Sequence, residues 1–319
     1  MLASPSPSLE SLEAADRLLA PERSTERNSW PLVDIIDLRE TDRPGLLTDA
    51  IVPLIRGVGP VACILNRKGR ARMLACATCD SLASCTECGA ALRENDAGRL
   101  ECPRDATTRP VVCAECGGSK MKLLRVGIAR MAEELAALAR REVTEVSADT
   151  PQHHLHGDGL YVGTEALLHR LDAARAVIFL DFDQELAMPR YRAAEDAFAL
   201  LALAARRVGP RVSGGRLLVQ TRRPGDVVVQ GALHGDPGRV SRAQRDVRKV
   251  FAQPPYGAWA LVSGAGAAAF VDTVEGARID RSGDRWRVSA ADHDALLRAL
   301  HGAKRPTDRV RIEVDPLTL

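Results

Sequence analysis

Apolar residues recur along this chain in two patterns, short runs and helical stripes. The runs predict strands over 32–38, 61–66, 142–147, 160–163, 176–180 and 216–221. Stripes with apolar residues three or four positions apart predict helices over 8–19, 46–56, 127–141 and 193–208. Before the first strand, the polar segment 21–31, PERSTERNSWP, is typical of a loop.

Strands and helices alternate as far as residue 224, and this order favours an open, mainly parallel α/β sheet. Ligands usually bind such sheets beyond the carboxyl ends of the strands. After Pro224 the pattern changes to a basic helix over 240–251, short strands and a last helix over 292–301. We therefore predict a separate small α+β domain at the C-terminal end.

The net charge is only +2, from 44 basic and 42 acidic residues, so a general basic field is excluded. Binding of nucleic acid would depend on local patches. One candidate patch has basic residues three or four positions apart, which predicts a single stripe on a helix. It consists of Arg239, Arg242, Arg245, Arg248 and Lys249. A solvated helix face explains this run about as well as phosphate contacts do.

The chain lacks the marks of a membrane or secreted protein. Its longest nearly uncharged apolar run, 197–205, is far shorter than the roughly 18 to 20 residues of a membrane span. The first residues have neither a basic start nor an apolar signal region. We expect an intracellular protein without a membrane partner.

Seven of the eight cysteines lie between residues 76 and 116, and only Cys63 stands apart, in the apolar run 61–66. We interpret Cys63 as a core residue of a strand. The cluster is arranged as Cys76-x2-Cys79, Cys85-x2-Cys88, Cys102-x2-Asp105 and Cys113-x2-Cys116. Without a secretory signal, such pairs indicate zinc rather than disulfides.

Four pairs imply two zinc sites, because each ion prefers four ligands. A segment this poor in large apolar side chains needs metal to fold, so the role of the zinc is structural. The eighth ligand position holds Asp105. A site of three thiolates and this carboxylate is one interpretation. A weaker or empty second site, with Asp105 paired to Arg104, is the other.

Two further carboxylates, Asp181 and Asp183, follow the predicted strand 176–180. They resemble a catalytic pair, but no nucleotide-binding motif accompanies them. We favour structural hydrogen bonding for both.

At this point several segments resemble the PriA family, the helicase-like replication-restart proteins of the primosome (primosomal protein N′). The matching segments are 2–12 (LASPSPSLESL), 33–39 (VDIIDLR), 63–69 (CILNRKG), 163–164 (GT), 181–195 (DFDQELAMPRYRAAE) and 253–256 (QPPY). The resemblance implies a helicase-like second lobe with a zinc-ribbon-type insert and a small α+β C-terminal domain. It also implies nested zinc pairs. Cys76, Cys79, Cys113 and Cys116 hold one ion, and Cys85, Cys88 and Cys102, with Asp105 or water, hold the other.

The family's domain order predicts four parts. Residues 1–55 are a remnant of the first lobe with a linker, and 56–72 with 118–224 form the second lobe. Residues 73–117 are the zinc-binding insert, and 225–319 are the C-terminal domain. The start at Met1 falls where the family is mid-domain, so we expect a degenerate, N-terminally short relative.

The departures from the family concern ATP. No G-x4-G-K-[ST] phosphate loop occurs in the sequence, and the acidic pair for magnesium is missing as well. His169 and Arg170 replace a Lys-Gly pair of motif V. In motif VI, Leu203 stands for a glutamine and Pro210 for an arginine, while Arg207 persists. Phosphoryl transfer depends on these charges, so we expect no ATP hydrolysis and no enzyme activity.

The resemblance therefore implies a cytoplasmic, nucleoid-associated bacterial protein that binds forked or branched DNA at abandoned replication forks. Its expected partners are other primosome proteins, the replicative helicase machinery and single-stranded DNA-binding protein. The basic helix is the expected DNA contact. The alternatives are a fragment of an ATP-dependent 3′–5′ DNA helicase and a zinc-ribbon protein-interaction module.

Overall fold

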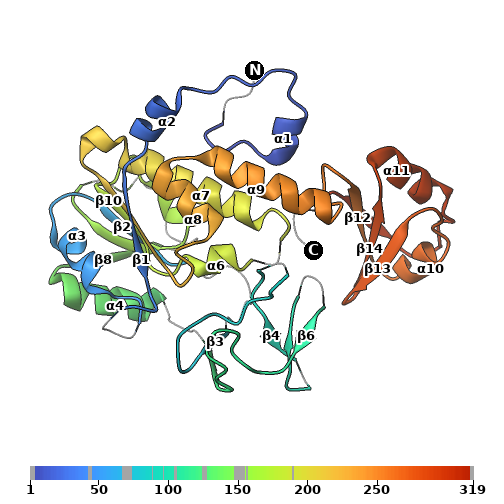
Figure 1. Ribbon diagram of the computed structural model, residues 1–319, viewed down its shortest axis with the longest axis horizontal. Helices are drawn as coiled ribbons and strands as arrows, with labels where there is room; N and C mark the ends of the chain where they lie inside the picture. The colour runs from blue at the N-terminus through green and yellow to red at the C-terminus, as the bar shows by residue number, and fades with distance from the viewer. Residues whose placement is uncertain are drawn as a thin grey trace. The chain divides into compact units, whose positions relative to one another are not determined.

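The computed structural model describes residues 4–41, 45–66, 74–87, 89–95, 97–103, 106–123, 128–146, 155, 157–188 and 190–316 (Figure 1). The chain divides into two compact units. The larger unit contains 20–189 and 193–240, and the smaller contains 1–19, 190–192 and 241–319. No helix in the described ranges has the length and apolarity needed to cross a bilayer.

A six-stranded sheet forms the centre of the larger unit. Its strands, in spatial order, are β1 (Leu32–Asp37), β11 (Arg216–Thr221), β10 (Ala176–Phe179), β2 (Val61–Ile64), β9 (Leu160–Gly163) and β8 (Val143–Val146). Every neighbouring pair is parallel. The prediction of an open, mainly parallel sheet is thereby confirmed.

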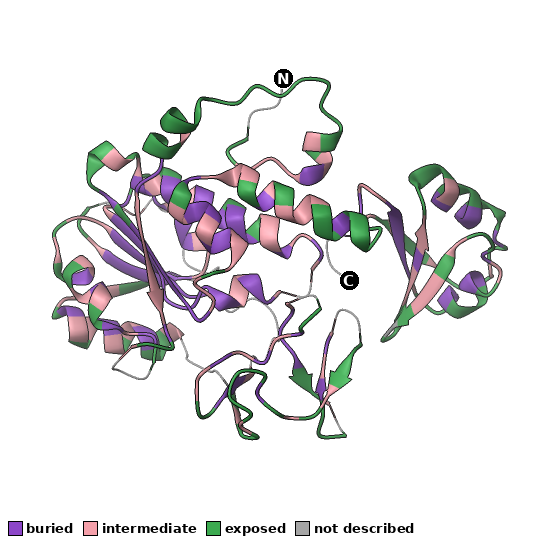
Figure 2. Cartoon of the chain, in the orientation of Figure 1, coloured by how far each residue is buried: buried purple, intermediate pink, exposed green. Residues whose placement is uncertain are grey.

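Helices bury both faces of this sheet, because successive residues of a strand point to opposite sides. On β2, Ala62 and Ile64 enter one apolar cluster, and Val61 and Cys63 enter the other. The first cluster includes residues of α5 (Ala166–Arg170), α6 (Asp183–Leu186), α7 (Ala193–Val208) and α8 (Val227–His234). The second includes residues of η1 (Asp49–Ile51), α3 (Val52–Arg56) and α4 (Ile128–Ala139). Figure 2 shows the central strands as buried.

The predicted element boundaries hold to different degrees along the larger unit. Strands β9 and β11 and helix α7 coincide with the predicted ranges residue for residue. The helix predicted over 46–56 is shorter, since only η1 and α3 form. Before them, Thr48 is buried and donates a hydrogen bond to Gln220 of β11.

The loop predicted over 21–31 was wrong, because helix α2 (Arg23–Ser29) forms there. Arg23 lies in its first turn, is ion-paired with Glu26, and donates hydrogen bonds to the carbonyl oxygens of Gly235 (2.8 Å) and His234 (3.2 Å). These carbonyls belong to the C-terminal end of α8, so a distant helix stabilises a segment whose local sequence favours no structure.

The cysteine-rich segment forms two small antiparallel sheets within the larger unit. One joins β3 (Leu74–Cys76) to β7 (Met121–Leu123), and the other joins β4 (Arg93–Glu94), β5 (Leu100–Glu101) and β6 (Thr108–Arg109). At the hairpin tip between β4 and β5, the N–H of Gly98 donates to the carbonyl oxygen of Asn95 (3.0 Å). The apolar cluster consists of small or medium side chains, namely Ala83, Cys85, Ala90, Leu92, Leu100 and Cys102.

The smaller unit contains α1 (Leu9–Glu13) and the C-terminal α+β part. The latter has the order β12 (Ala258–Ser263), α10 (Ala267–Val271), β13 (Arg278–Ser282), β14 (Arg285–Ala290), α11 (His293–Gly302), β15 (Arg311–Val314). Its antiparallel sheet has the strand order β13-β14-β12-β15, the split βαβ arrangement. Helix α9 (Pro237–Val250) runs from one unit into the other.

The two units differ from the predicted four-part division. Residues 4–19 lie with the C-terminal part, whereas β1 adds an edge strand to the large sheet. The cysteine-rich segment is grouped with that sheet.

Candidate metal centre

Four cysteine sulfurs converge at one point of the cysteine-rich segment. The Sγ atoms of Cys76, Cys79, Cys113 and Cys116 all lie within 4.8 Å of one another. Cys76 and Cys116 are 3.5 Å apart and Cys79 and Cys113 are 3.6 Å apart. The first and last pairs of the segment thus meet, as the nested arrangement implied.

The backbone repeats one turn at each of the four pairs. In the first, Cys76 donates to the carbonyl of Ser81 (2.8 Å), and Asp80 donates back to that of Cys76 (3.1 Å). The turns that begin at Cys85, Cys102 and Cys113 have the same two hydrogen bonds. The residue after each fourth position has a positive φ, namely Asp80 (58°), Gly89 (70°), Ala106 (60°) and Gly117 (74°).

These turns aim N–H groups at the sulfur atoms. The N–H of Thr78 donates to the sulfur of Cys76 at 3.4 Å. Backbone donors from Cys79 and Thr78 lower the pKa of the Cys76 thiol to about 6. A thiol that ionises at neutral pH is already in the form that binds metal. In the same cage, the Gly118 backbone donor lowers the pKa of the Cys116 thiol, but hydrogen bonds with Cys79 and Cys76 outweigh it and raise that pKa to about 12.

The four-sulfur cage fits zinc by donor type and by size. Zinc binds thiolates at about 2.3 Å in a tetrahedron, which places the sulfurs about 3.8 Å apart. The two measured separations, 3.5 and 3.6 Å, are close to that value. Four protein ligands complete the coordination, so such an ion stabilises the fold and has no open position for a reacting water.

The second predicted site is only partly described. Cys85 and Cys102 are both buried in the small apolar cluster of the segment. Cys88 and Asp105 lie outside the described residues. The turn at Cys102 nevertheless closes like the others, since the N–H of Ala106 donates to the Cys102 carbonyl at 2.9 Å.

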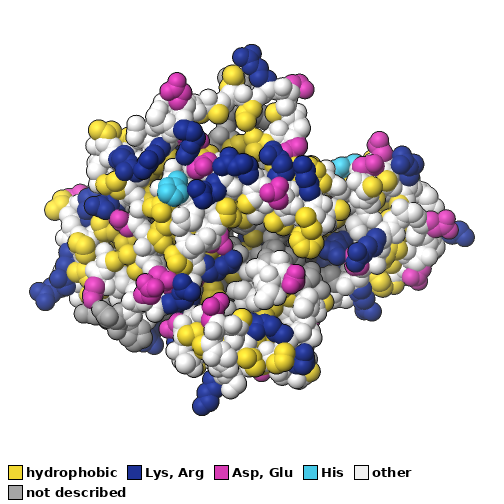
Figure 3. All heavy atoms as spheres, in the orientation of Figure 1, with side chains coloured by type: hydrophobic (Ala, Val, Ile, Leu, Met, Phe, Trp, Pro, Cys, Tyr) yellow, Lys and Arg dark blue, Asp and Glu magenta, His cyan; other side chains and the backbone are white. Residues whose placement is uncertain are grey.

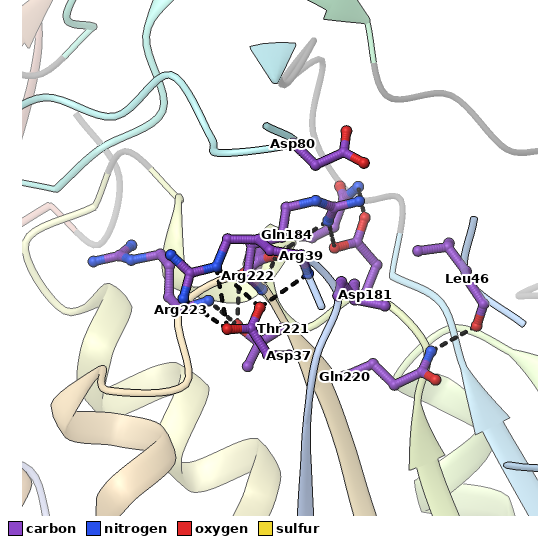
Figure 4. A network of polar contacts seen from close by, with 12 residues as sticks. Asp37, Arg39, Leu46, Asp80, Asp181, Gln184, Gln220, Thr221, Arg222 and Arg223 are labelled. Atoms are coloured by element: carbon purple, nitrogen blue, oxygen red, sulfur yellow. Dashed lines mark hydrogen bonds and ion pairs between the residues drawn. The ribbon is translucent and has the colours of Figure 1, made fainter. Parts of the chain in front are cut away.

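Another cluster of polar side chains lies at the carboxyl edge of the parallel sheet (Figure 4). Asp181 and Asp183 follow β10, and Arg222 follows β11. The Arg222 guanidinium contacts Asp181 at 3.3 Å and Asp183 at 3.2 Å, and all three side chains are buried. Thr221 donates a further hydrogen bond to Asp183 (2.5 Å).

This arrangement supports the structural interpretation of the two aspartates. Their charges are compensated by one buried arginine and by hydrogen bonds, so neither faces solvent. Burial and the neighbouring Asp183 raise the pKa of Asp181 to about 6. Arg222 was not predicted from the sequence as the partner of these aspartates. Its position directly after the apolar strand β11 is the sequence feature that places it at the same edge of the sheet.

The residues at positions that resemble helicase motifs make structural contacts. Gly163 ends β9, and Arg207, on α7, donates a hydrogen bond to the carbonyl oxygen of Leu168 (2.7 Å). Leu203, which stands where the family has a glutamine, packs against the apolar cluster of the large sheet. Cys63 is wholly buried on β2, as predicted, and burial raises the pKa of its thiol to about 12.

The basic helix does not present one stripe. Arg239, Arg242 and Lys249 are exposed. Arg245 is ion-paired with Glu13 at 2.7 Å. Arg248 has no exposed side-chain surface and contacts Glu10 at 2.8 Å. On the face drawn in Figure 3, basic side chains lie among acidic and apolar ones.

Helix geometry explains this correction. A step of three residues turns an α-helix by about 300°, so each successive arginine lags by about 60°. After three such steps Arg248 lies on the opposite side of α9 from Arg239. Its burial excludes it from a surface patch, and we withdraw it from the proposed DNA contacts.

No protein-family model matches the chain. Curated proteins from several bacteria do match. The replication restart protein PriA of Bacillus subtilis (strain 168) is 26% identical over 291 residues, which cover 82% of this chain and 36% of that protein. The chain is similar to replication restart protein PriA. This confirms the resemblance predicted from the sequence.

Other PriA proteins repeat the match. That of Treponema pallidum (strain Nichols) is 25% identical over 80% of this chain, and the probable PriA of Mycobacterium bovis is 30% identical over 66% of it. The chain spans between 33% and 42% of the length of these three relatives.

Proposed function

We propose that this chain acts in replication restart by binding branched DNA at abandoned forks and promoting reloading of the replicative helicase. The observation that carries the proposal is the similarity to PriA over 82% of the chain. Its partners are forked DNA, other primosome proteins and single-stranded DNA-binding protein, in the cytoplasm and at the nucleoid.

The chain works without ATP hydrolysis of its own. Its sequence contains no phosphate loop, and the half-buried Leu203 packs against the apolar cluster at the position of a polar motif residue. Without charge neutralisation around the phosphates, phosphoryl transfer has no catalyst. ATPase turnover of the purified protein with forked DNA should stay at background. Turnover that co-elutes with the protein and is lost in Arg207→Ala would favour the alternative, a fragment of an ATP-dependent helicase.

Zinc in this proposal is structural and occupies two sites. The cage of Cys76, Cys79, Cys113 and Cys116 holds one ion tightly. The second, weaker site consists of Cys85, Cys88, Cys102 and Asp105. Asp105→Cys should raise the zinc content measured by elemental analysis, because a thiolate binds zinc more tightly than this carboxylate does. An unchanged content would mean that Asp105 is not a ligand.

The DNA contacts include the exposed side of α9, with Arg239, Arg242 and Lys249 and the half-buried Arg245. With a net charge of +2, affinity must come from such local groups. Arg239→Ala/Arg242→Ala should weaken binding to a fluorescent fork and make the slope of log affinity against log salt shallower by about 1.8. Arg130→Ala/Arg298→Ala, which removes the same charge from exposed positions on α4 and α11, is the control.

Equal losses in the two double variants would show that α9 is a solvated face. If the wild-type protein binds no fork even at low salt, the function would have to depend on protein contacts. That result would favour the third candidate, a zinc-ribbon interaction module.

A further inference from the structure

The end of helix α1 places a carboxylate against the basic helix α9 of the same unit. The Arg245 atoms Nε and Nη2 both donate to Oε1 of Glu13, at 2.8 and 2.7 Å. Lys249, one turn further along α9, lies over the ring of Tyr256 at 5.2 Å. The Arg245 guanidinium therefore already binds an anionic group, the Glu13 carboxylate of the same chain.

The hydroxyl of Tyr256 borders the same ion pair. Its oxygen is buried and has no hydrogen-bond partner of normal geometry. The Arg245 guanidinium, followed by the Tyr256 hydroxyl, lowers the pKa of Glu13, so both groups act on that carboxylate. The hydroxyl therefore faces an acceptor without forming a well-aligned hydrogen bond, which is a costly state for a buried polar group. A phosphate, whose oxygens are arranged tetrahedrally, can present an oxygen to this hydroxyl and to Arg245 together.

The beginning of α1 is held quite differently. The side chain of Leu9 has no exposed surface. One carboxylate oxygen of Glu10 binds both Arg192 and Arg248, each at 2.8 Å. Arg248 also donates to the carbonyl of Pro254 at 2.9 Å. These buried contacts anchor the helix, whereas Glu13, its last residue, keeps 33% of its side chain exposed.

We propose that Arg245, Tyr256 and Lys249 form a phosphate site for the DNA backbone, and that Glu13 occupies it until DNA displaces its carboxylate. The inference rests on the proposed DNA binding and names one of its contacts. A phosphodiester offers Arg245 its two anionic oxygens, and one of them can also accept a hydrogen bond from the Tyr256 hydroxyl. Leu9 and Glu10 keep α1 in place while the Glu13 side chain moves.

Removal of the competing charge tests this idea. Glu13→Gln should bind a fluorescent forked DNA roughly threefold to tenfold more tightly than wild type, since one intramolecular competitor is lost. Glu275→Gln is the matched control, because it makes the same change of charge at an exposed position of the same unit. It should change the affinity by less than about twofold, a general field effect.

A double variant shows whether the gain acts through Arg245. Adding Arg245→Gln to Glu13→Gln should cancel the gain and make the salt slope shallower by about 0.9, one phosphate contact. Glu10→Gln should instead lower the thermal midpoint and give no gain in affinity beyond the control, because it uncovers the buried Arg248.

The outcomes separate the two proposals. If wild type and Glu275→Gln bind forks and Glu13→Gln binds no better, the phosphate site is refuted and DNA binding stands. If only Glu13→Gln binds, the competition is stronger than expected and the site is supported. If no variant binds forks at low salt, both proposals fail.

Discussion

The parallel sheet and the cysteine-rich segment belong to the same unit but are stabilised by different means. Strands β2, β9 and β10 are buried at every position. The segment has only a small cluster of short side chains and four repeated turns. Burial of apolar surface stabilises the first region, whereas in the second the proposed zinc would supply much of the stability. Loss of one contact should therefore have very different effects in the two regions.

The largest expected effect comes from a cysteine of the cage. Cys113→Ser should remove about one zinc per chain and unfold the segment, because structural zinc in small domains contributes about 10–16 kcal/mol of binding. Elemental analysis and amide exchange at Leu92 and Leu100 are the measurements. Cys63→Ser changes a residue of the sheet. This variant should retain the full zinc content of the protein and lower the free energy of unfolding by about 1–3 kcal/mol. Full zinc retention in Cys113→Ser would contradict the proposal that this segment depends on metal ligation.

The next effect concerns the polar edge of the sheet. Arg222→Ala should lower the free energy of unfolding by about 3–5 kcal/mol, since two buried carboxylates lose their common partner. Arg223→Ala breaks the partly exposed pair with Asp226 and a long hydrogen bond (3.4 Å) to the Gly89 carbonyl, and it should cost about 0–1 kcal/mol. Chemical denaturation measures both. Similar losses in the free energy of unfolding for the two variants would show that burial does not determine how much each arginine contributes to stability.

The same edge should make stability depend on pH. The pKa of Asp181 is raised to about 6 in the folded protein, against about 3.9 for an unfolded aspartate. The folded state then holds the proton more tightly, so this contribution is present below about pH 4 and is lost as the pH rises through about 6. We expect a loss of about 2–3 kcal/mol, absent in Asp181→Asn.

Denaturation midpoints between pH 4 and 7 provide the measurement for this pH effect. Asp158→Asn, at an exposed position of the same unit, is the control and should keep the wild-type dependence. A wild-type dependence in Asp181→Asn as well would assign the effect to other groups.

The smallest expected effect concerns backbone strain at one of the four cysteine turns. Ala106 has φ = 60°, where the other turns have glycine or aspartate. A side chain in this conformation costs about 1 kcal/mol, partly offset by the greater chain entropy of glycine. Ala106→Gly should stabilise the segment by roughly 0.5 kcal/mol, whereas Ala97→Gly at the hairpin tip should not. Zinc release on titration with a chelator provides the readout, and equal effects would exclude strain at Ala106.

Several features could be predicted because they depend on local patterns. Runs of apolar residues predicted β9 and β11 to the residue, since burial on both sides leaves such runs no other stable environment. Apolar residues three or four positions apart predicted α7 to the residue. The four cysteine pairs predicted metal ligands, because two residues between thiols suit one turn around an ion. That the first and last pairs share one ion was implied by the family resemblance and not by the spacing. The split of the α9 arginines also follows from helix geometry, which turns a three-residue repeat around the axis.

Only the tertiary structure decided which side of α9 is buried, and therefore that Arg248 and not Arg239 pairs with Glu10. It also placed Arg222 between Asp181 and Asp183, and it joined residues 4–19 to the C-terminal part of the chain. Each of these contacts joins segments far apart in the sequence, and a charged side chain carries no local sign of its distant partner. Apolar and cysteine patterns reveal themselves along the chain, whereas the pairing of buried charges is determined when the elements pack.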